Sequence, residues 1–223
     1  MNDVTPTLTA FDWVPDFARG LVRDLRVRWA FEELGEPYRI EKFGAGTPRP
    51  AGYVDWQPFE QVPAFRDGDQ EFFESGAILL YLAEKHGALL PADPQARWQA
   101  IAWLFAALNS VEPAFQRHAI YTVFNAKADW SAGATEALEP LLRQKLGRVE
   151  HALGEKEWLA GEFSIADIVM VTVLNIIGKT GFVGEFPALA AYHARGLARP
   201  AYKRALDAQL ADFDGQAPSQ KGA

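Results

Sequence analysis

Gln-Val-Pro-Ala-Phe-Arg-Asp-Gly-Asp-Gln-Glu-Phe-Phe-Glu-Ser-Gly-Ala-Ile-Leu-Leu-Tyr-Leu, residues 61–82, is the stretch that decides the fold. A proline opens the short apolar run Val62–Phe65, and Asp67–Asp69 carry a turn signal before a second run, Glu71–Phe73. This order predicts a β-hairpin. Apolar residues then recur at helical spacing behind Ser75, a favourable N-cap, so a helix follows the hairpin.

The same stretch predicts a binding site for an amino-acid-like ligand. A proline at a strand entrance leaves nearby backbone groups free to pair with a peptide ligand. The positive end of the helix and the Ser75 hydroxyl suit a carboxylate, and Glu74 beside them suits an ammonium group. The alternative is a hairpin and a capped helix with Glu74 merely solvated, and the pattern alone leaves both open.

Composition bounds the function class. The chain has 223 residues, 49% of them hydrophobic, a net charge of −7 and no cysteine. That length suffices for one large or two modest domains, and the acidic balance argues against nucleic acid or an anionic membrane as partner. Because residues 1–10 show no signal pattern and no apolar run reaches about 18 residues, we expect a cytoplasmic protein. Without cysteine, no mechanism can use a protein thiol.

The order of elements predicts two domains. The first part alternates strand, helix, strand, loop, hairpin and helix, which is typical of a thioredoxin-like α/β domain over residues 1–87. Two prolines mark a linker at 88–94. An all-helical domain is expected over 95–212, and the polar residues 213–223 are expected to form a disordered tail.

Hydrophobic patterns divide the helical part further. A long helix through Trp98, Trp103 and Val111 is expected to kink at Pro113, with both tryptophans in the core. An i, i+4 stripe predicts a second helix over 138–153, and the apolar run 165–177 predicts a central buried helix that starts in a capping box of Ser164 and Asp167. Two short helices are expected over 187–195 and 200–210.

Three separated motifs resemble cytosolic glutathione transferases: residues 57–84, the segment Val27–Tyr38, and the segment Trp158–Asp167, with Leu8–Trp13 similar to the family's first strand. The resemblance spans roughly residues 7 to 210. It implies glutathione as co-substrate, held by Gln61, Val62, Pro63, Glu74 and Ser75. It also implies a homodimer and a small hydrophobic electrophile as second substrate.

The usual thiol-activating residue of that family is missing. A free thiol is only about 3% ionised at pH 7, and lowering its pKa by about 2 units requires roughly 2.7 kcal/mol of thiolate stabilisation. Family members supply this with a Tyr, Ser or Cys, yet none lies between Trp13 and Pro37. Arg19 or Arg23, aided by the first helix's N-terminal N–H groups, could substitute. The alternative is that both arginines pair with nearby aspartates in solvent.

Other candidate residues follow from the resemblance. Lys42 and Arg49 are both candidates for the ligand's glycyl carboxylate. The electrophile pocket is expected near Phe105, Asn109, His118 and Tyr121. No histidine pair has metal-ligand spacing, so no metal is expected.

These features leave two classes of function open. The first is an enzyme that conjugates glutathione to an electrophile or uses it in isomerisation, dehalogenation or peroxide reduction. The second is a protein that binds glutathione, or another partner, without catalysis.

Overall fold

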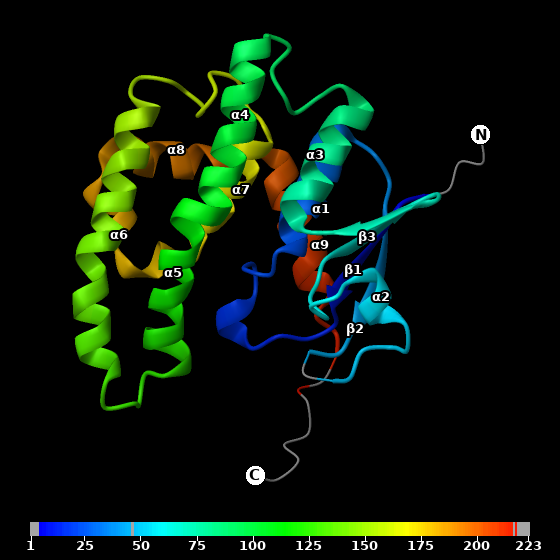
Figure 1. Ribbon diagram of the computed structural model, residues 1–223, viewed down its shortest axis with the longest axis horizontal. Coiled ribbons are helices and arrows are strands. Elements are labelled where there is room, and N and C mark those ends of the chain that lie inside the picture. The colour runs from blue at the N-terminus through cyan, green and yellow to red at the C-terminus, as the bar shows by residue number, and fades with distance from the viewer. Residues whose placement is uncertain (1–4, 46, 216, 218–223) are drawn as a thin grey trace. The chain divides into compact units, whose positions relative to one another are not determined.

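The computed structural model describes residues 5–45, 47–215 and 217, and it divides into two compact units. One unit comprises Met1–His86 together with Pro200–Ala223, and the other comprises Gly87–Arg199. The first holds a four-stranded mixed sheet with helices, and the second is helical (Figure 1). The predicted fold class, a thioredoxin-like domain followed by a helical region, is confirmed.

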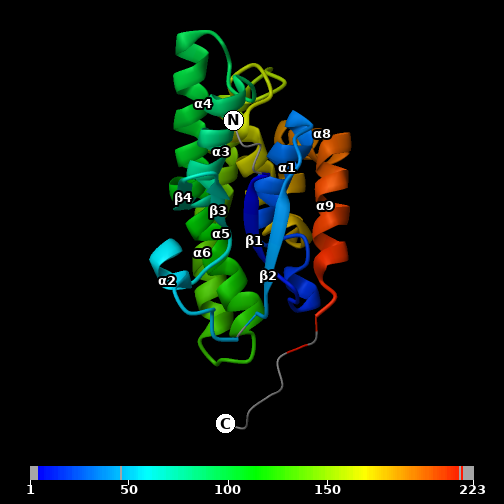
Figure 2. The same ribbon diagram turned by 90° about the vertical axis from the view of Figure 1, so that its right-hand side faces the viewer.

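The sheet of the first unit has the strand order β2-β1-β3-β4. Its strands are β1 (Thr7–Phe11), β2 (Arg39–Phe43), β3 (Ala64–Asp67) and β4 (Gln70–Phe73). β1 runs parallel to β2, side by side in Figure 2, and antiparallel to β3, which is antiparallel to β4. The predicted hairpin is confirmed, although its first strand begins at Ala64 instead of Val62.

Helices cover both faces of this sheet. The unit contains α1 (Asp24–Leu34), α2 (Tyr53–Trp56), α3 (Ser75–His86) and α9 (Pro200–Asp212). Phe65 of β3 contacts Phe31 of α1 and Tyr81 of α3, so these two helices share one face. Strand side chains alternate between faces, and Thr9 of β1 bonds to Tyr53, so α2 lies on the other face.

Helix α9 packs along α1 in the first unit (Figure 1). This differs from the prediction, which extended the helical domain to residue 212. The Trp29 and Tyr202 rings meet edge to face at 4.9 Å, and Arg204 Nε lies 2.6 Å from Glu32 Oε2. The sequence prediction assigned residues 200–210 to the helical domain 95–212, because they follow its other helices directly along the chain. The buried side chains of α9 instead complete the first unit.

The expected tail also differs from the structure in its first residues. Phe213 is buried, the Asp214 carboxylate lies 2.7 Å from Lys42 Nζ, and Gly215 N–H donates to the Asp12 carbonyl. These contacts order residues 213–215. The remaining residues of that prediction, apart from 217, lie outside the described residues.

The second unit contains α4 (Pro94–Ala106), α5 (Glu112–Ala119), α6 (Ser131–Leu153), α7 (Ile165–Asn175) and α8 (Pro187–Ala198). The long helix expected before Pro113 is divided, because a π-helical turn, Ala107–Val111, separates α4 from α5. Pro113 lies in the first turn of α5, where its missing N–H costs nothing. The prediction that Trp98 lies in the core is wrong, since it is 69% exposed.

Helix α7 is buried on all sides, as predicted, and its capping box is confirmed. Asp167 accepts hydrogen bonds from the backbone N–H groups of Ser164 and Leu159 and from the Tyr192 hydroxyl, at 2.9, 3.0 and 2.9 Å. Burial raises the pKa of the Asp167 carboxyl. No helix among the described residues has the length and apolar character needed to cross a membrane.

Candidate functional site

One edge of the sheet gathers the predicted site residues of the first unit. Because β1 and β2 are parallel and β3 runs the other way, the ends of β1, β2 and β4 meet the beginning of β3 at this edge. Helices α1 and α3 both start there, since each follows a strand that ends there. The edge therefore combines Pro63, the start of α3, and the loop Asp12–Arg23, which we call the opening loop.

A chain of hydrogen bonds holds the strand entrance at Pro63. The peptide bond between Val62 and Pro63 is cis. Ala64 N–H donates to Thr9 Oγ1 at 2.7 Å, Thr9 Oγ1 lies 2.9 Å from Tyr53 Oη, and Tyr53 donates to the Gln61 carbonyl at 2.7 Å. Since the Tyr53 proton goes to Gln61, the Thr9 hydroxyl donates to Tyr53. Burial raises the pKa of Tyr53, which keeps this donor protonated.

Val62 keeps its backbone groups available in the middle of this fixed turn. The buried Gln57 side chain accepts the Phe59 and Gln61 N–H groups at 2.7 and 3.1 Å, so both backbone groups of Gln61 have partners. Within the described residues, no hydrogen bond involves the Val62 N–H or carbonyl. A rigid turn with one open donor and one open acceptor can pair with an extended peptide.

Glu74 stands at the start of α3 with an unusual backbone. Its φ of 75° lies in the left-handed region, which a side chain other than glycine adopts at a cost of about 1–2 kcal/mol. Its carbonyl accepts the Ile78 N–H at 3.0 Å, so Glu74 is the capping residue, and the prediction that Ser75 caps the helix is off by one residue. The Glu74 side chain is exposed.

Ser75 is buried and has a partner that the pattern did not predict. Arg26 of α1, also buried, donates from Nη1 to Ser75 Oγ at 3.3 Å. A hydroxyl has one proton and two lone pairs, so this bond uses a lone pair and leaves the Ser75 proton to donate elsewhere. Ser75 thus offers a donor next to a guanidinium, which favours an anionic acceptor.

The opening loop has two arginines with different surroundings. Arg19 Nε lies 3.2 Å from Asp16 Oδ1, and its guanidinium lies 5.7 Å from the Phe213 ring centre. The ion pair is the outcome that the alternative prediction expected for Arg19. Arg23, half-buried, immediately precedes α1. Asp24 pairs with neither of them but with the buried Arg28, at 2.7 Å.

The first turn of α1 has its N–H groups engaged. Leu25 and Arg26 N–H donate to the carbonyls of Val22 and Arg23, at 3.1 and 3.2 Å, and the Asp24 carboxylate accepts its own N–H. These groups are not free to donate to a thiolate, in contrast to the expectation. Any contribution of α1 is limited to the field of its dipole.

Lys42 and Arg49 both have partners inside the protein. Lys42 Nζ donates to Asp214 Oδ1 at 2.7 Å. Arg49 donates to the carbonyls of Glu60 and Gly44 at 3.0 and 2.9 Å, and it stabilises the loop after β2. The lysine is partly exposed and its ammonium group has three donors, so Lys42 can bind a further acceptor, while the arginine bonds hold backbone that shapes the edge.

The residues expected to line an electrophile pocket lie in the second unit. Phe105 and Asn109 are exposed, and Tyr121 is half-buried with its ring 5.4 Å from that of Trp130. His118 is buried, contacts the Phe182 ring, and has its pKa lowered by burial. These residues occupy α4, α5 and the π-helical turns beside them.

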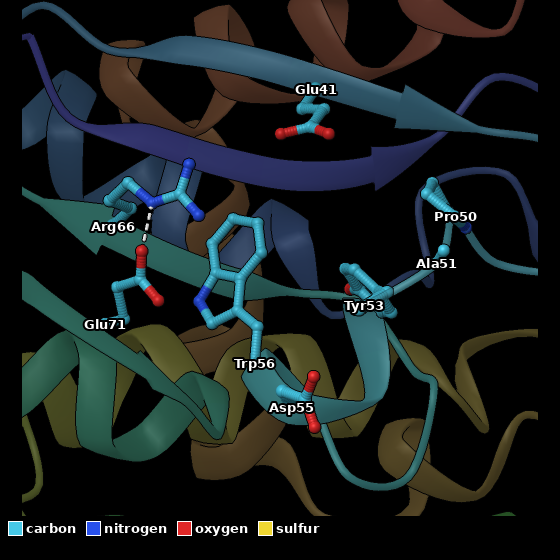
Figure 3. A pocket seen from close by; sticks show the side chains of 9 residues that line it. Glu41, Pro50, Ala51, Tyr53, Asp55, Trp56, Arg66 and Glu71 are labelled. Atoms are coloured by element: carbon cyan, nitrogen blue, oxygen red, sulfur yellow. Dashed lines mark hydrogen bonds and ion pairs between the residues drawn. The ribbon is translucent and has the colours of Figure 1, made fainter.

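A pocket of about 270 Å³ lies in the first unit between α2 and the strands (Figure 3). Trp56 and Tyr53 point into it from α2, and the Arg66 guanidinium lies 4.6 Å above the Trp56 ring and pairs with Glu71. None of the sequence-predicted site residues is among those that line it. Within the described part of the chain, no three His, Asp or Glu side chains are grouped as metal ligands.

Comparisons with known proteins are consistent with this geometry. The glutathione S-transferase N-terminal domain matches residues 7–84, and the glutathione S-transferase C-terminal domain matches residues 111–200. The disulfide-bond oxidoreductase YfcG of Escherichia coli is 33% identical over 195 residues, which cover 81% of this chain and 89% of that protein.

Solved structures agree. A glutathione transferase family member from Pseudomonas fluorescens, with two glutathione bound, has a TM-score of 0.80 at 28% identity and covers 92% of this chain and 94% of that chain. The yeast protein Ure2p in complex with glutathione has a TM-score of 0.79 at 26% identity, with 93% and 95% covered. Because both domain models match in order and together span more than half of the residues, this chain belongs to the glutathione S-transferase family.

Proposed function

We propose that this chain binds glutathione at the sheet edge and activates its thiol for attack on a small hydrophobic electrophile. The observation that carries the proposal is the open backbone pair of Val62 beside an exposed acid, Glu74, and a buried hydroxyl, Ser75. These are the charges and hydrogen-bonding groups that a γ-glutamyl peptide requires. The glutathione bound in similar structures supports it.

Each part of the tripeptide has a proposed partner. The α-carboxylate of the γ-glutamyl group accepts the Ser75 proton at the positive end of α3. The neighbouring ammonium group pairs with Glu74. The cysteinyl N–H and carbonyl pair with the Val62 backbone, as in strand addition. For the glycyl carboxylate, Lys42 is the more available of the two candidates, because its partly exposed ammonium group has three donors and can keep its bond to Asp214 while it binds the ligand.

The sulfur then faces the opening loop, where Arg23 and Arg19 are the proposed thiolate partners. Loss of the thiol proton to solvent gives the thiolate, which forms a carbon–sulfur bond to the electrophile. Either a leaving group departs with its electron pair, or an activated double bond takes up a proton. Arg23 starts α1 and so combines its charge with the helix dipole.

Thiolate absorbance tests this proposal directly. We expect the pKa of bound glutathione to lie about 1–2 units below that of the free thiol. Arg23→Ala and Arg19→Ala should each raise that pKa, whereas Arg148→Ala, an exposed arginine of α6, serves as the matched control and should not. Calorimetry with glutathione measures binding separately. Tight binding with an unshifted thiol would instead indicate a glutathione-binding protein without catalysis.

A second candidate is glutathione-dependent disulfide reduction, which the 33% identical oxidoreductase favours. This chain has no cysteine, so both electrons have to come from two glutathione molecules. One thiolate attacks the substrate disulfide and releases a thiol, and the second attacks the mixed disulfide to give glutathione disulfide and a second thiol. Incubation with a small organic disulfide, with glutathione disulfide as the measured product, distinguishes this activity from conjugation.

We also propose that the chain forms a homodimer in the cytoplasm, as the family resemblance implies. Sedimentation of the full chain at micromolar concentration tests the first part, and cell fractionation tests the second. A monomer at micromolar concentration would overturn the proposed homodimer without affecting the proposed glutathione site.

A further inference from the structure

The last residue of α9 and the three residues that follow it lie against the opening loop, nearly two hundred residues away in sequence. We call Asp212–Gly215 the C-terminal segment. Gly215 N–H donates to the Asp12 carbonyl at 2.9 Å, where the opening loop leaves β1. The Phe213 ring is buried and contacts the Arg19 guanidinium. The segment thus contacts the loop at its start and in its middle.

Helix α9 contacts the rest of the loop. The buried Gln209 side chain donates to the Val22 carbonyl at 3.2 Å and to Asp24 Oδ1 at 2.7 Å. Gly20 has a φ of +76°, and a Cβ built on it would lie 3.2 Å from Leu206 Cδ1, so the loop passes close to the helix. Four points along the loop therefore depend on α9 and the C-terminal segment.

The segment itself is attached to rigid elements. Asp212 Oδ2 lies 2.7 Å from Arg28 Nη2 on α1, and Asp214 Oδ1 lies 2.7 Å from Lys42 Nζ on β2. One end of the segment is thus fixed by a buried arginine and the other by a strand lysine. A short peptide fixed in this way can hold a neighbouring loop that has no strand pairing of its own.

We propose that Phe213 and Asp214 are positioning residues, which hold the opening loop in place and thereby set Arg19 and Arg23 for the glutathione thiolate. This inference rests on the proposed function. The Phe213 ring contacts Arg19 directly, and the Asp214–Lys42 pair keeps the segment against the sheet edge. Neither residue needs to touch glutathione for this role.

Limited trypsin digestion of the full chain tests the structural half, because cleavage after Arg19 or Arg23 requires the loop to open. For Phe213→Ala and Asp214→Asn we expect cleavage at these two sites to rise, by about tenfold or more for Phe213→Ala. Arg204→Gln is the matched control, since it removes an α9–α1 ion pair at Glu32, outside the loop, and should leave cleavage unchanged. Urea unfolding separates loop opening from global unfolding.

The absorbance of bound thiolate tests the functional half. For both variants we expect the pKa of bound glutathione to rise, by about 1 unit for Phe213→Ala, while glutathione Kd changes less than about threefold. Unchanged cleavage in both variants overturns the positioning role. Faster cleavage with an unshifted pKa overturns its link to the thiolate. If the wild-type protein binds glutathione with an ordinary thiol pKa, the proposed function fails instead, and the cleavage result stands by itself.

Discussion

Ser75→Ala should weaken glutathione binding by about 10- to 100-fold. Ser75 is 3% exposed, and its oxygen already accepts from Arg26, so its proton is the one the ligand carboxylate would accept. A hydrogen bond to a charged group contributes about 1.5–3 kcal/mol. Since about 1.4 kcal/mol corresponds to a tenfold change in Kd, the loss falls in that range.

Calorimetry with two ligands isolates the interaction. The first ligand is glutathione, and the second is the analogue whose γ-glutamyl α-carboxylate is a neutral carboxamide. The wild-type protein should bind the carboxamide more weakly, by about as much as Ser75→Ala weakens glutathione binding, and the variant should bind both ligands alike. Ser131→Ala is the control, because Ser131 is a buried serine of the other unit whose hydroxyl bonds to a backbone carbonyl.

A double-mutant cycle between Arg26 and Ser75 tests the role of Arg26. If Arg26 orients Ser75, the effects of Arg26→Gln and Ser75→Ala on glutathione binding should not add, with a coupling of about 0.5–3 kcal/mol. The proposed bond from Ser75 to the γ-glutamyl α-carboxylate is refuted if Ser75→Ala binds glutathione within about threefold of the wild-type protein. It is also refuted if the substitution weakens binding of the carboxamide as much as it weakens binding of glutathione. Additive effects in the cycle would refute the orienting role of Arg26 alone.

Three further predictions concern the second unit. Asp167→Ala should lower the free energy of unfolding by about 3–5 kcal/mol in urea titrations, because buried N–H groups lose their acceptor. Asp93→Ala, at the exposed start of α4, is the control and should cost only about 1 kcal/mol. Gly196→Ala should destabilise by about 1–3 kcal/mol, since its Cβ would lie 2.5 Å from a valine Cγ2 of α7, whereas Gly133→Ala, with open space, should stabilise slightly. Burial lowers the pKa of His118 below 6.5, although the charge of Glu139 acts to raise it. As pH drops below about 6.5 the unfolded chain therefore takes up the histidine proton before the folded chain does, and stability falls. His118→Gln should show a shallower decline of stability with pH.

The sequence predicted the hairpin and the start of α3 because their signals are local. A proline, an Asp-Gly turn and a helical repeat act within a few residues of themselves. The capping box of α7 is local for the same reason, because Asp167 follows the Ser164 cap by three positions. Glu74 and Ser75 stand where that local helix begins, so their place beside a helix N-terminus could be predicted, whereas the burial of Ser75 depends on packing and could not.

The supports of the site depend on contacts between distant residues. Thr9 and Tyr53 are 44 residues apart, and Arg26 and Ser75 are 49 apart. Thr9 and Arg26 do leave a weak signal, because each is a polar residue among the apolar residues of a core element. Neither position says which partner satisfies it, since many pairings would satisfy a lone hydroxyl or guanidinium equally well.

Electrostatics decides which arginine the thiolate can recruit. The Arg28–Asp24 pair is 1% exposed on both sides, and separating such a pair costs about 3–5 kcal/mol. That exceeds the roughly 2.7 kcal/mol that a thiol pKa shift of about 2 units represents, so Arg28 stays with its aspartates. The Arg19–Asp16 pair has side chains 38% and 98% exposed, and such pairs contribute at most about 1 kcal/mol. A thiolate held at the sheet edge can therefore displace Asp16, and pairing with an aspartate in the absence of ligand does not argue against Arg19.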